Sequence, residues 1–220
     1  KQDTVMESKL KETIKEYGQA LLIAFILAFV IRSFVVQAFK IPSGSMLPTL
    51  KIGDHLLVNK FIYGVKLPFT DIEIVPVSKP EFQDIIVFEY PENQSKDFIK
   101  RVVGLPGDKI KIKKGHLIRN GKKVPEPYAQ FSHNTRAEEK FPAERWPPHE
   151  FDRRARDNLG PIKIPEDKYF VLGDNRDESY DSRFWGCVQS KDILGEAWII
   201  YWSWKSLTDI RFSRIGHLVE

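Results

Sequence analysis

The stretch KIKIKKGHLIRNGKKV, residues 109–124, consists of three short segments separated by turn residues. Asn120-Gly121 lies between segments 116–119 and 122–124, and this dipeptide is a strong signal for a two-residue β-hairpin turn. Short segments bounded by such residues are typical of strands. We therefore expect antiparallel β structure in this stretch.

Short segments of the same kind recur on both sides of the stretch and predict a mainly β fold. The region 125–165 differs, because Pro, Arg, Glu and Asn dominate it and its apolar residues do not alternate. We expect an inserted excursion there, with little regular structure of its own. The further predicted strands are 55–63, 84–90, 98–103, 168–172 and 196–204.

The amino-terminal part contains one long apolar run. Every residue from Ala20 to Ile31 is apolar, and after Arg32 and Ser33 the run resumes through Val36. Such a run is about the minimum for a helix that spans the hydrocarbon core of a membrane. A cleavable signal peptide is the alternative, because a basic leader before a shorter apolar run fits that pattern too. We favour an anchor, since apolar residues continue past Arg32.

Lysines before the apolar run indicate that the amino terminus is cytoplasmic. The predicted architecture is therefore a single amino-terminal transmembrane helix followed by an antiparallel β domain with an inserted irregular or β excursion. The basic residues in question are Lys1, Lys9, Lys11 and Lys15. The expected parts are a cytoplasmic segment 1–19, an anchor 20–37, a β-rich core of 38–112 and 166–220, and an inserted hairpin and loop region 113–165.

The composition argues against several classes of function. The net charge of +4 arises from 34 basic and 30 acidic residues that are interleaved, so we expect no nucleic-acid partner, and the positive excess suits anionic lipid instead. The single cysteine, Cys187, cannot form an internal disulfide. No Cys/His spacing suits zinc, and we expect neither a metal nor an organic cofactor.

Two segments resist a purely structural explanation, PSGSMLPTL at 42–50 and FIKRVVGLPGD at 98–108. The first is too rich in Pro and Gly for regular structure, and such a loop can present a serine hydroxyl. In the second, strand alternation places Lys100 and Arg101 on opposite faces, each among apolar neighbours. An arginine stays protonated, whereas a desolvated lysine can lose its proton. Only Lys100 could therefore act as a base.

A base is what an isolated serine requires, because its hydroxyl is a weak nucleophile until a neighbouring group takes the proton. Lowering the pKa of a lysine from about 10.4 to about 8 costs about 3 kcal/mol, which burial can supply. Taken alone, the two segments also fit an ordinary turn and a surface lysine. A Ser-His-Asp triad is a further alternative, because residues distant in sequence can meet in the fold. The histidines are His55, His116, His133, His149 and His217.

The chain resembles the type I signal peptidase family, also called leader peptidase, through four blocks that follow the predicted anchor in the family's order. The blocks are 42–50, Gly53-Asp54 with Val58-Asn59-Lys60, 100–108, and GDNRDESYDSRFWG at 173–186. The resemblance spans about residues 20–204 and is weakest in 125–165. Glu178 stands where many members of the family have Asn.

This resemblance implies a Ser–Lys dyad in which Ser45 is the nucleophile and Lys100 its general base. The Ser45 backbone N–H and the Ser43 hydroxyl would form the oxyanion hole. Ser179 would hydrogen-bond the amine of Lys100 and orient it.

The resemblance also assigns supporting roles. Asp181 and Arg183 would form an ion pair near the site, and Asp174 would help to hold the same loop. Four apolar residues match positions that line shallow pockets for the small side chains of the substrate, with ordinary core packing as the alternative. These residues are Ile41, Pro42, Met46 and Ile99.

The implied function is a serine endopeptidase that cuts signal peptides from secretory preproteins at Ala-x-Ala sites. The enzyme would be a single-pass protein of the bacterial cytoplasmic membrane, with its catalytic domain on the outer side and membrane lipid as a second partner. The alternatives are a membrane-tethered β module that binds exported chains without cutting them, and a self-cleaving repressor, which would need a DNA-binding domain. Four tryptophans could rest in the lipid interface, with core packing as the alternative for two: Trp185, Trp198, Trp202 and Trp204.

Overall fold

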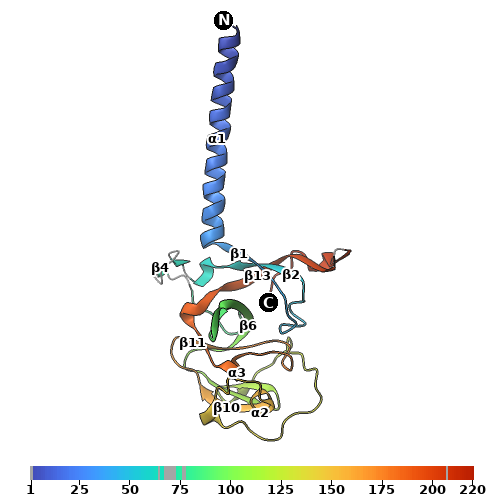
Figure 1. Ribbon diagram of the computed structural model, residues 1–220. Coiled ribbons are helices and arrows are strands. Elements are labelled where there is room, and N and C mark those ends of the chain that lie inside the picture. The colour runs from blue at the N-terminus through green and yellow to red at the C-terminus, as the bar shows by residue number, and fades with distance from the viewer. Residues whose placement is uncertain (1, 64, 67–72, 76–77, 207) are drawn as a thin grey trace.

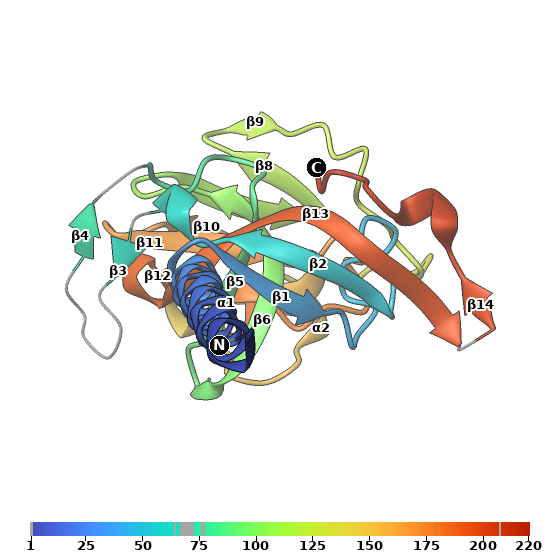
Figure 2. The same ribbon diagram turned by 90° about the horizontal axis from the view of Figure 1, so that it is seen from above.

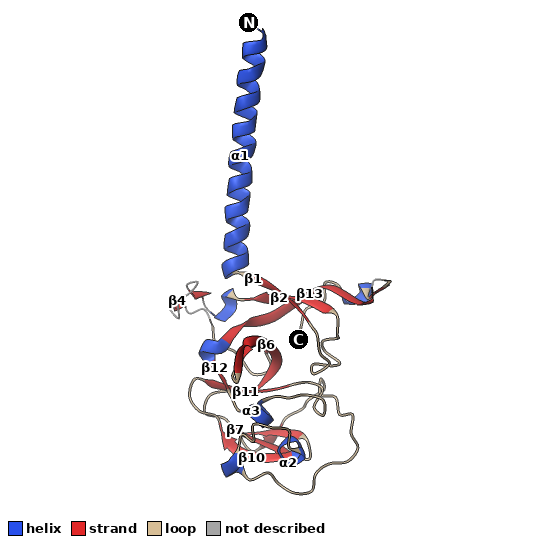
Figure 3. Cartoon of the chain, in the orientation of Figure 1, coloured by secondary structure: helices blue, strands red, loops and turns tan. Residues whose placement is uncertain are grey.

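The computed structural model of the protein describes residues 2–63, 65–66, 73–75, 78–206 and 208–220. One long helix, α1 (Gln2–Phe34), projects from a body made mainly of strands, and the amino terminus lies at the far end of this helix (Figures 1 and 3). Among the described residues, no helix combines the length and the apolar character needed to cross a membrane.

The helix ends earlier than the predicted anchor of 20–37. It stops at Phe34, and the next strand, β1 (Val36–Lys40), already contains Val36 and Gln37. The reason is pairing, because β1 runs antiparallel to β2 (Asp54–Asn59) with Val36 opposite Asn59. A ladder of backbone hydrogen bonds thus takes over from the helical bonds two residues past its end.

The main sheet is antiparallel throughout and has the strand order β1-β2-β13-β5-β6-β11-β12, with β14 paired to β13. Seen along α1, strands β1, β2 and β13 run side by side beneath the helix (Figure 2). The remaining strands of this sheet are β5 (Ile85–Tyr90), β6 (Asn93–Gly104), β11 (Lys168–Leu172), β12 (Val188–Gln189), β13 (Ile193–Ser206) and β14 (Asp209–Ile210).

A second sheet of four strands has the order β10-β7-β8-β9 and contains the predicted hairpin of 109–124. Its strands are β7 (Lys109–Lys113), β8 (His116–Arg119), β9 (Lys122–Lys123) and β10 (Asn158–Lys163). A two-stranded sheet pairs β3 (Val65–Lys66) with β4 (Glu73–Val75). The short helices are α2 (Arg153–Asp157), α3 (Ser182–Trp185), η1 (Phe61–Tyr63), η2 (Ala143–Arg145), η3 (Ser190–Asp192) and η4 (Phe212–Arg214).

The predicted lack of regular structure in 125–165 is therefore wrong at the end of that region. Strand β10 pairs with β7 and completes the second sheet, although its sequence, NLGPIK, contains Gly160 and Pro161. The pairing shifts register between Leu159 and Ile162, so the two turn-forming residues lie within a bulge. Because of this bulge, the apolar residues of β10 do not alternate regularly, and the sequence pattern did not predict the strand.

Strand β5 explains how the core is organised. Its sequence IIVFEY is almost continuously apolar, because both of its faces are buried. Ile86 and Phe88 belong to one core cluster together with residues of the second sheet, and Ile85 and Val87 belong to another. The second cluster also contains Met46 and therefore supports the loop that follows β1.

Candidate active site

The segment 42–50 forms a loop between β1 and β2. Two backbone hydrogen bonds close its base, from Ile41 N to Asp54 O at 2.8 Å and from Gly53 N to Ile41 O at 2.9 Å. Within the loop, Leu50 N donates to Met46 O at 2.9 Å, and the Met46 side chain is fully buried. Ser45 is 9% exposed, so its hydroxyl lies at the border between the core and solvent.

Lys100 lies on β6 and is 4% exposed. Its Nζ donates to Ser45 Oγ at 2.9 Å and to the Ile99 carbonyl at 2.9 Å, and it lies 5.3 Å from the centre of the Phe98 ring. Burial lowers the pKa of Lys100 to about 8, although the negative charges of Asp181 and Asp174 act in the opposite direction. A substantial share of this amine is therefore neutral at mildly alkaline pH and able to accept a proton.

The family resemblance implies a hydrogen bond between Ser179 and the amine of Lys100, and the structure has no such bond. The Ser179 hydroxyl is buried and has no well-formed hydrogen bond with any described residue, although its interaction with the Asp181 carboxylate is among the causes that lower the pKa of Asp181. Lys100 Nζ donates to Ser45 Oγ and to the Ile99 carbonyl instead. Ser179 packs instead over Gly173. A Cβ on Gly173 would overlap the Ser179 side chain and would lie 2.5 Å from the backbone oxygen of Ser45.

Asp181 and Arg183 form the expected ion pair. Arg183 Nε and Nη2 donate to the two carboxylate oxygens of Asp181 at 2.8 Å each, and both side chains are buried. Burial by itself would raise the pKa of Asp181, but the charge and hydrogen bonds of Arg183 and the bond from Gly173 N hold it below its ordinary value. The bond from Gly173 N, 3.0 Å long, fixes the start of the loop that carries Ser179.

Asp174 holds the same loop through a partner that sequence reasoning missed. Arg101 Nε and Nη2 donate to its carboxylate at 2.9 and 2.8 Å, and Thr49 Oγ1 donates to it at 2.6 Å. Strand alternation predicted only that Arg101 faces away from Lys100. The sequence around Arg101 contains no signal that its partner is Asp174, which lies 73 positions later in the chain.

Asn175 is a second contact that the sequence did not reveal. Its backbone N donates to Ser45 O at 3.0 Å, and its side-chain Nδ2 donates to Gly44 O at 3.0 Å. Asn175 thereby holds the carbonyl groups of the two peptide bonds that flank Ser45, one before it and one after it. The block 173–186 contains this residue, but an asparagine in a turn has many other uses.

The remaining predicted residues differ in burial. Ser43 and Pro42 are exposed, and Ile99 is partly buried against the cluster that contains Met46. Ile41 is 2% exposed and Met46 is fully buried in that cluster, which fits the alternative of core packing for these two. No group of three metal-ligating side chains occurs within the described residues.

Comparisons with known proteins agree on one family. A family model described as signal peptidase, peptidase S26, matches residues 14–202. Signal peptidase I of Pseudomonas aeruginosa is 39% identical over 96% of this chain and 82% of its own length. Signal peptidase I of Pseudomonas fluorescens is 37% identical over 97% of this chain and 83% of its own length. The match to the crystal structure of a signal peptidase I from Enterococcus faecalis has 31% sequence identity and a TM-score of 0.41. It covers 54% of this chain and 97% of the Enterococcus faecalis chain.

Proposed function

This chain belongs to the signal peptidase family, peptidase S26, and from that premise we propose that it is a membrane-anchored serine endopeptidase that removes signal peptides from secreted preproteins. The cut follows small residues in an Ala-x-Ala pattern. The enzyme sits in the bacterial cytoplasmic membrane with its β domain on the outer side.

One observation carries the proposal, the 2.9 Å contact between Lys100 Nζ and Ser45 Oγ in a buried setting. A neutral amine at this distance can take the serine proton as the oxygen attacks the carbonyl of the scissile bond. Lys100 then gives the proton to the leaving amine, and an acyl-enzyme forms on Ser45. A water molecule, deprotonated by the same amine, hydrolyses the ester and returns Ser45 to its free state.

Two donors stabilise the oxyanion in this mechanism, the backbone N–H of Ser45 and the hydroxyl of Ser43. Both are on the loop that Asn175 holds through Gly44 O and Ser45 O. Exposure of Ser43 leaves its hydroxyl free to rotate toward the substrate carbonyl. Ile99 and Pro42, which are not fully buried, contact the small substrate side chains.

The described part of α1 supports membrane anchoring, because its apolar side chains have no protein neighbours that cover them. Their exposed fractions range from 52% to 70%. Burial of this much apolar surface in lipid removes it from water. The residues are Leu21, Leu22, Ile23, Phe25, Ile26, Leu27 and Phe29.

A lipid-facing surface on the β domain would involve fewer tryptophans than the sequence suggests. Trp185 is 4% exposed and packs against Phe88 and Tyr90 in the core, so it is excluded. Trp198 is 50% exposed and lies on β13, so it is the tryptophan that contacts lipid head groups in this proposal.

Cleavage of a preprotein by the detergent-solubilised protein tests the proposal. We expect Ser45→Ala and Lys100→Ala each to abolish cleavage. Ser95→Ala and Lys96→Ala are matched controls, because both residues lie on the exposed half of β6, and these variants should cleave at the wild-type rate. Binding of the preprotein without cleavage by the wild type would favour the non-catalytic module instead.

A further inference from the structure

The first part of the inserted region lies along the loop that follows β11. We call residues 126–136 the strap. Gln130 of the strap forms a parallel bridge with Asn175. Its N donates to Asp174 O at 2.7 Å, and its O accepts from Arg176 N at 2.9 Å. The backbone of the strap therefore holds the segment whose side chains contact the nucleophile loop and β6.

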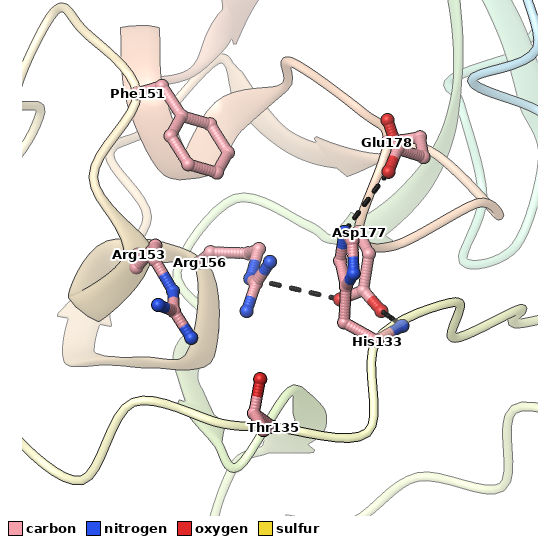
Figure 4. A pocket seen from close by; sticks show the side chains of 7 residues that line it. All are labelled: His133, Thr135, Phe151, Arg153, Arg156, Asp177 and Glu178. Carbon is pink, nitrogen blue, oxygen red and sulfur yellow. Dashed lines mark hydrogen bonds and ion pairs between the residues drawn. The ribbon is translucent and has the colours of Figure 1, made fainter.

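Side chains fix the strap toward both of its ends. At its start, the Glu126 carboxylate accepts a hydrogen bond of 3.0 Å from Leu117 N and pairs with the buried Arg176 guanidinium at 2.5 Å. Toward its other end, His133 N donates to the Asp177 carboxylate at 2.8 Å, and Figure 4 shows this bond. The strap thus connects β8 of the second sheet with the loop that follows β11.

Between these fixed points, Tyr128 covers one face of Arg101. The Cζ atom of Arg101 lies 4.0 Å from the centre of the Tyr128 ring, which makes this a cation–π contact. The Tyr128 hydroxyl is buried and bonds to no described residue. The ring of Tyr128, and not its hydroxyl, therefore makes the contact with Arg101.

Hydrogen-bond acceptors occupy the edge of the same guanidinium. Besides the two bonds to Asp174, Arg101 donates from Nη1 to Gln83 O at 3.0 Å and from Nη2 to Glu220 O at 3.1 Å. All N–H bonds of a guanidinium lie in its plane, so acceptors leave its faces open, and a stacked ring covers one of them. Water in place of the ring would screen the attraction between Arg101 and Asp174, which is stronger where water is excluded.

We propose that Tyr128 is a positioning residue for the catalytic dyad, because its ring keeps the Arg101 guanidinium on Asp174. Arg101 directly follows Lys100 on β6, and Asp174 accepts a hydrogen bond from the loop that carries Ser45. A shift of Arg101 would therefore change the distance between the base and the nucleophile, and small shifts of reacting groups slow a reaction strongly. This inference rests on the proposed function and adds a residue of the inserted region to it.

The test measures kcat and KM for cleavage of a preprotein by variants at position 128. Tyr128→Leu keeps an apolar side chain but has no ring, and we expect kcat to fall by about tenfold while KM stays close to the wild-type value. Tyr128→Phe keeps the ring and loses only the hydroxyl, so it should keep the wild-type kcat.

Phe82→Leu is the matched control for the loss of a ring. The Phe82 ring lies under another paired arginine, because the Cζ atom of Arg119 is 4.4 Å from its centre and Arg119 pairs with Asp108. This variant loses the same kind of contact at an arginine that does not pair with Asp174, and its kcat should equal that of the wild type.

A graded replacement of the ring separates the cation–π contact from packing. Phenylalanine and its trifluoro and pentafluoro derivatives are incorporated in turn at position 128. Fluorine withdraws electron density from the face of the ring and changes its shape little, so the attraction for Arg101 weakens along this series. We expect kcat to fall in the same order, and the series decides the question even if Tyr128→Leu does not fold.

The outcomes separate this inference from the proposed function. Equal kcat across the fluorinated series, or wild-type kcat in Tyr128→Leu, would overturn the inference and leave the peptidase assignment intact. A loss of about tenfold in Tyr128→Phe would assign the effect to the hydroxyl, and the same loss in Phe82→Leu would assign it to general destabilisation; either would reject the role of the ring. Failure of the wild type to cut the preprotein, or cutting by Ser45→Ala, would instead overturn the proposed function.

Discussion

Arg101 and Asp174 form a bidentate ion pair, with Nε to Oδ1 at 2.9 Å and Nη2 to Oδ2 at 2.8 Å, and their side chains are 3% and 0% exposed. Arg101 follows Lys100 on β6, and Asp174 precedes Asn175, which bonds to Ser45 O. Thr49, on the loop that carries Ser45, also donates a hydrogen bond from its Oγ1 to the Asp174 carboxylate. The pair therefore joins the strand of the base to the loop of the nucleophile.

Breaking this pair should affect both stability and activity. Asp174→Asn leaves the Arg101 charge buried without a counter-charge, which typically costs about 3–5 kcal/mol. We expect the free energy of unfolding, measured in a denaturant titration, to fall by about this amount. We also expect kcat for cleavage to fall at temperatures where the variant is still folded, because the distance between Ser45 and Lys100 is no longer fixed.

The double variant Arg101→Met/Asp174→Leu serves as the control for charge burial. Apolar replacement of both partners removes the desolvation penalty together with the attraction, so its loss of stability should be much smaller. A double variant as unstable as Asp174→Asn would contradict the idea that the unpaired charge causes the loss.

The rate of cleavage should rise with pH, because the base must be neutral. Burial lowers the pKa of Lys100 to about 8, so the neutral fraction increases tenfold per pH unit below that value and levels off above it. We expect log kcat/KM to rise with a slope of about one and to bend near pH 8. A bend above pH 10, near the value of a free lysine, would show that the amine is solvated in the working enzyme.

The sequence was informative about strands and less so about contacts between them. The hairpin of 109–124 and the strands at 84–90 and 98–103 are confirmed, because apolar residues bounded by turn residues report local geometry. Contacts such as Arg101 with Asp174 or Asn175 with Gly44 join residues far apart in the chain, and no local pattern reports them. Ser45 and Lys100, 55 positions apart, were matched only through the family resemblance.

Gly173→Ala should reduce activity by displacing the nucleophile. A Cβ at this position would lie 2.5 Å from Ser45 O and would overlap the Ser179 side chain, so one of the two segments must move. Because Ser45 O is part of the backbone, this movement shifts the hydroxyl away from Lys100. We expect kcat to fall by about tenfold or more, since small displacements of reacting groups are costly.

Gly18→Ala is the matched control, because a Cβ there would meet no atom within 4 Å. It should cleave preproteins at the wild-type rate. Wild-type kcat in Gly173→Ala would mean that the loop yields without moving Ser45, and the close contact would then have no role in catalysis.

Lys100→Met should give a protein that is inactive and yet more stable at neutral pH. The pKa of Lys100 falls from 10.5 in the unfolded chain to about 8 in the folded protein, so between these values the unfolded chain holds a proton that the folded protein has released. The free energy of unfolding of the wild type therefore rises with pH through this window, and below pH 8 the buried amine costs about 3 kcal/mol. Methionine has no charge to desolvate, so the free energy of unfolding of the variant should exceed that of the wild type by up to about 3 kcal/mol at pH 7, and this advantage should be lost above pH 10.5.

Lys96→Met, on the exposed half of β6, is the control, and its stability relative to the wild type should show no such dependence on pH. If the stabilities of wild type and Lys100→Met differ by the same amount at pH 7 and above pH 10.5, the amine is not desolvated in the folded protein, and its role as a neutral base loses its physical support.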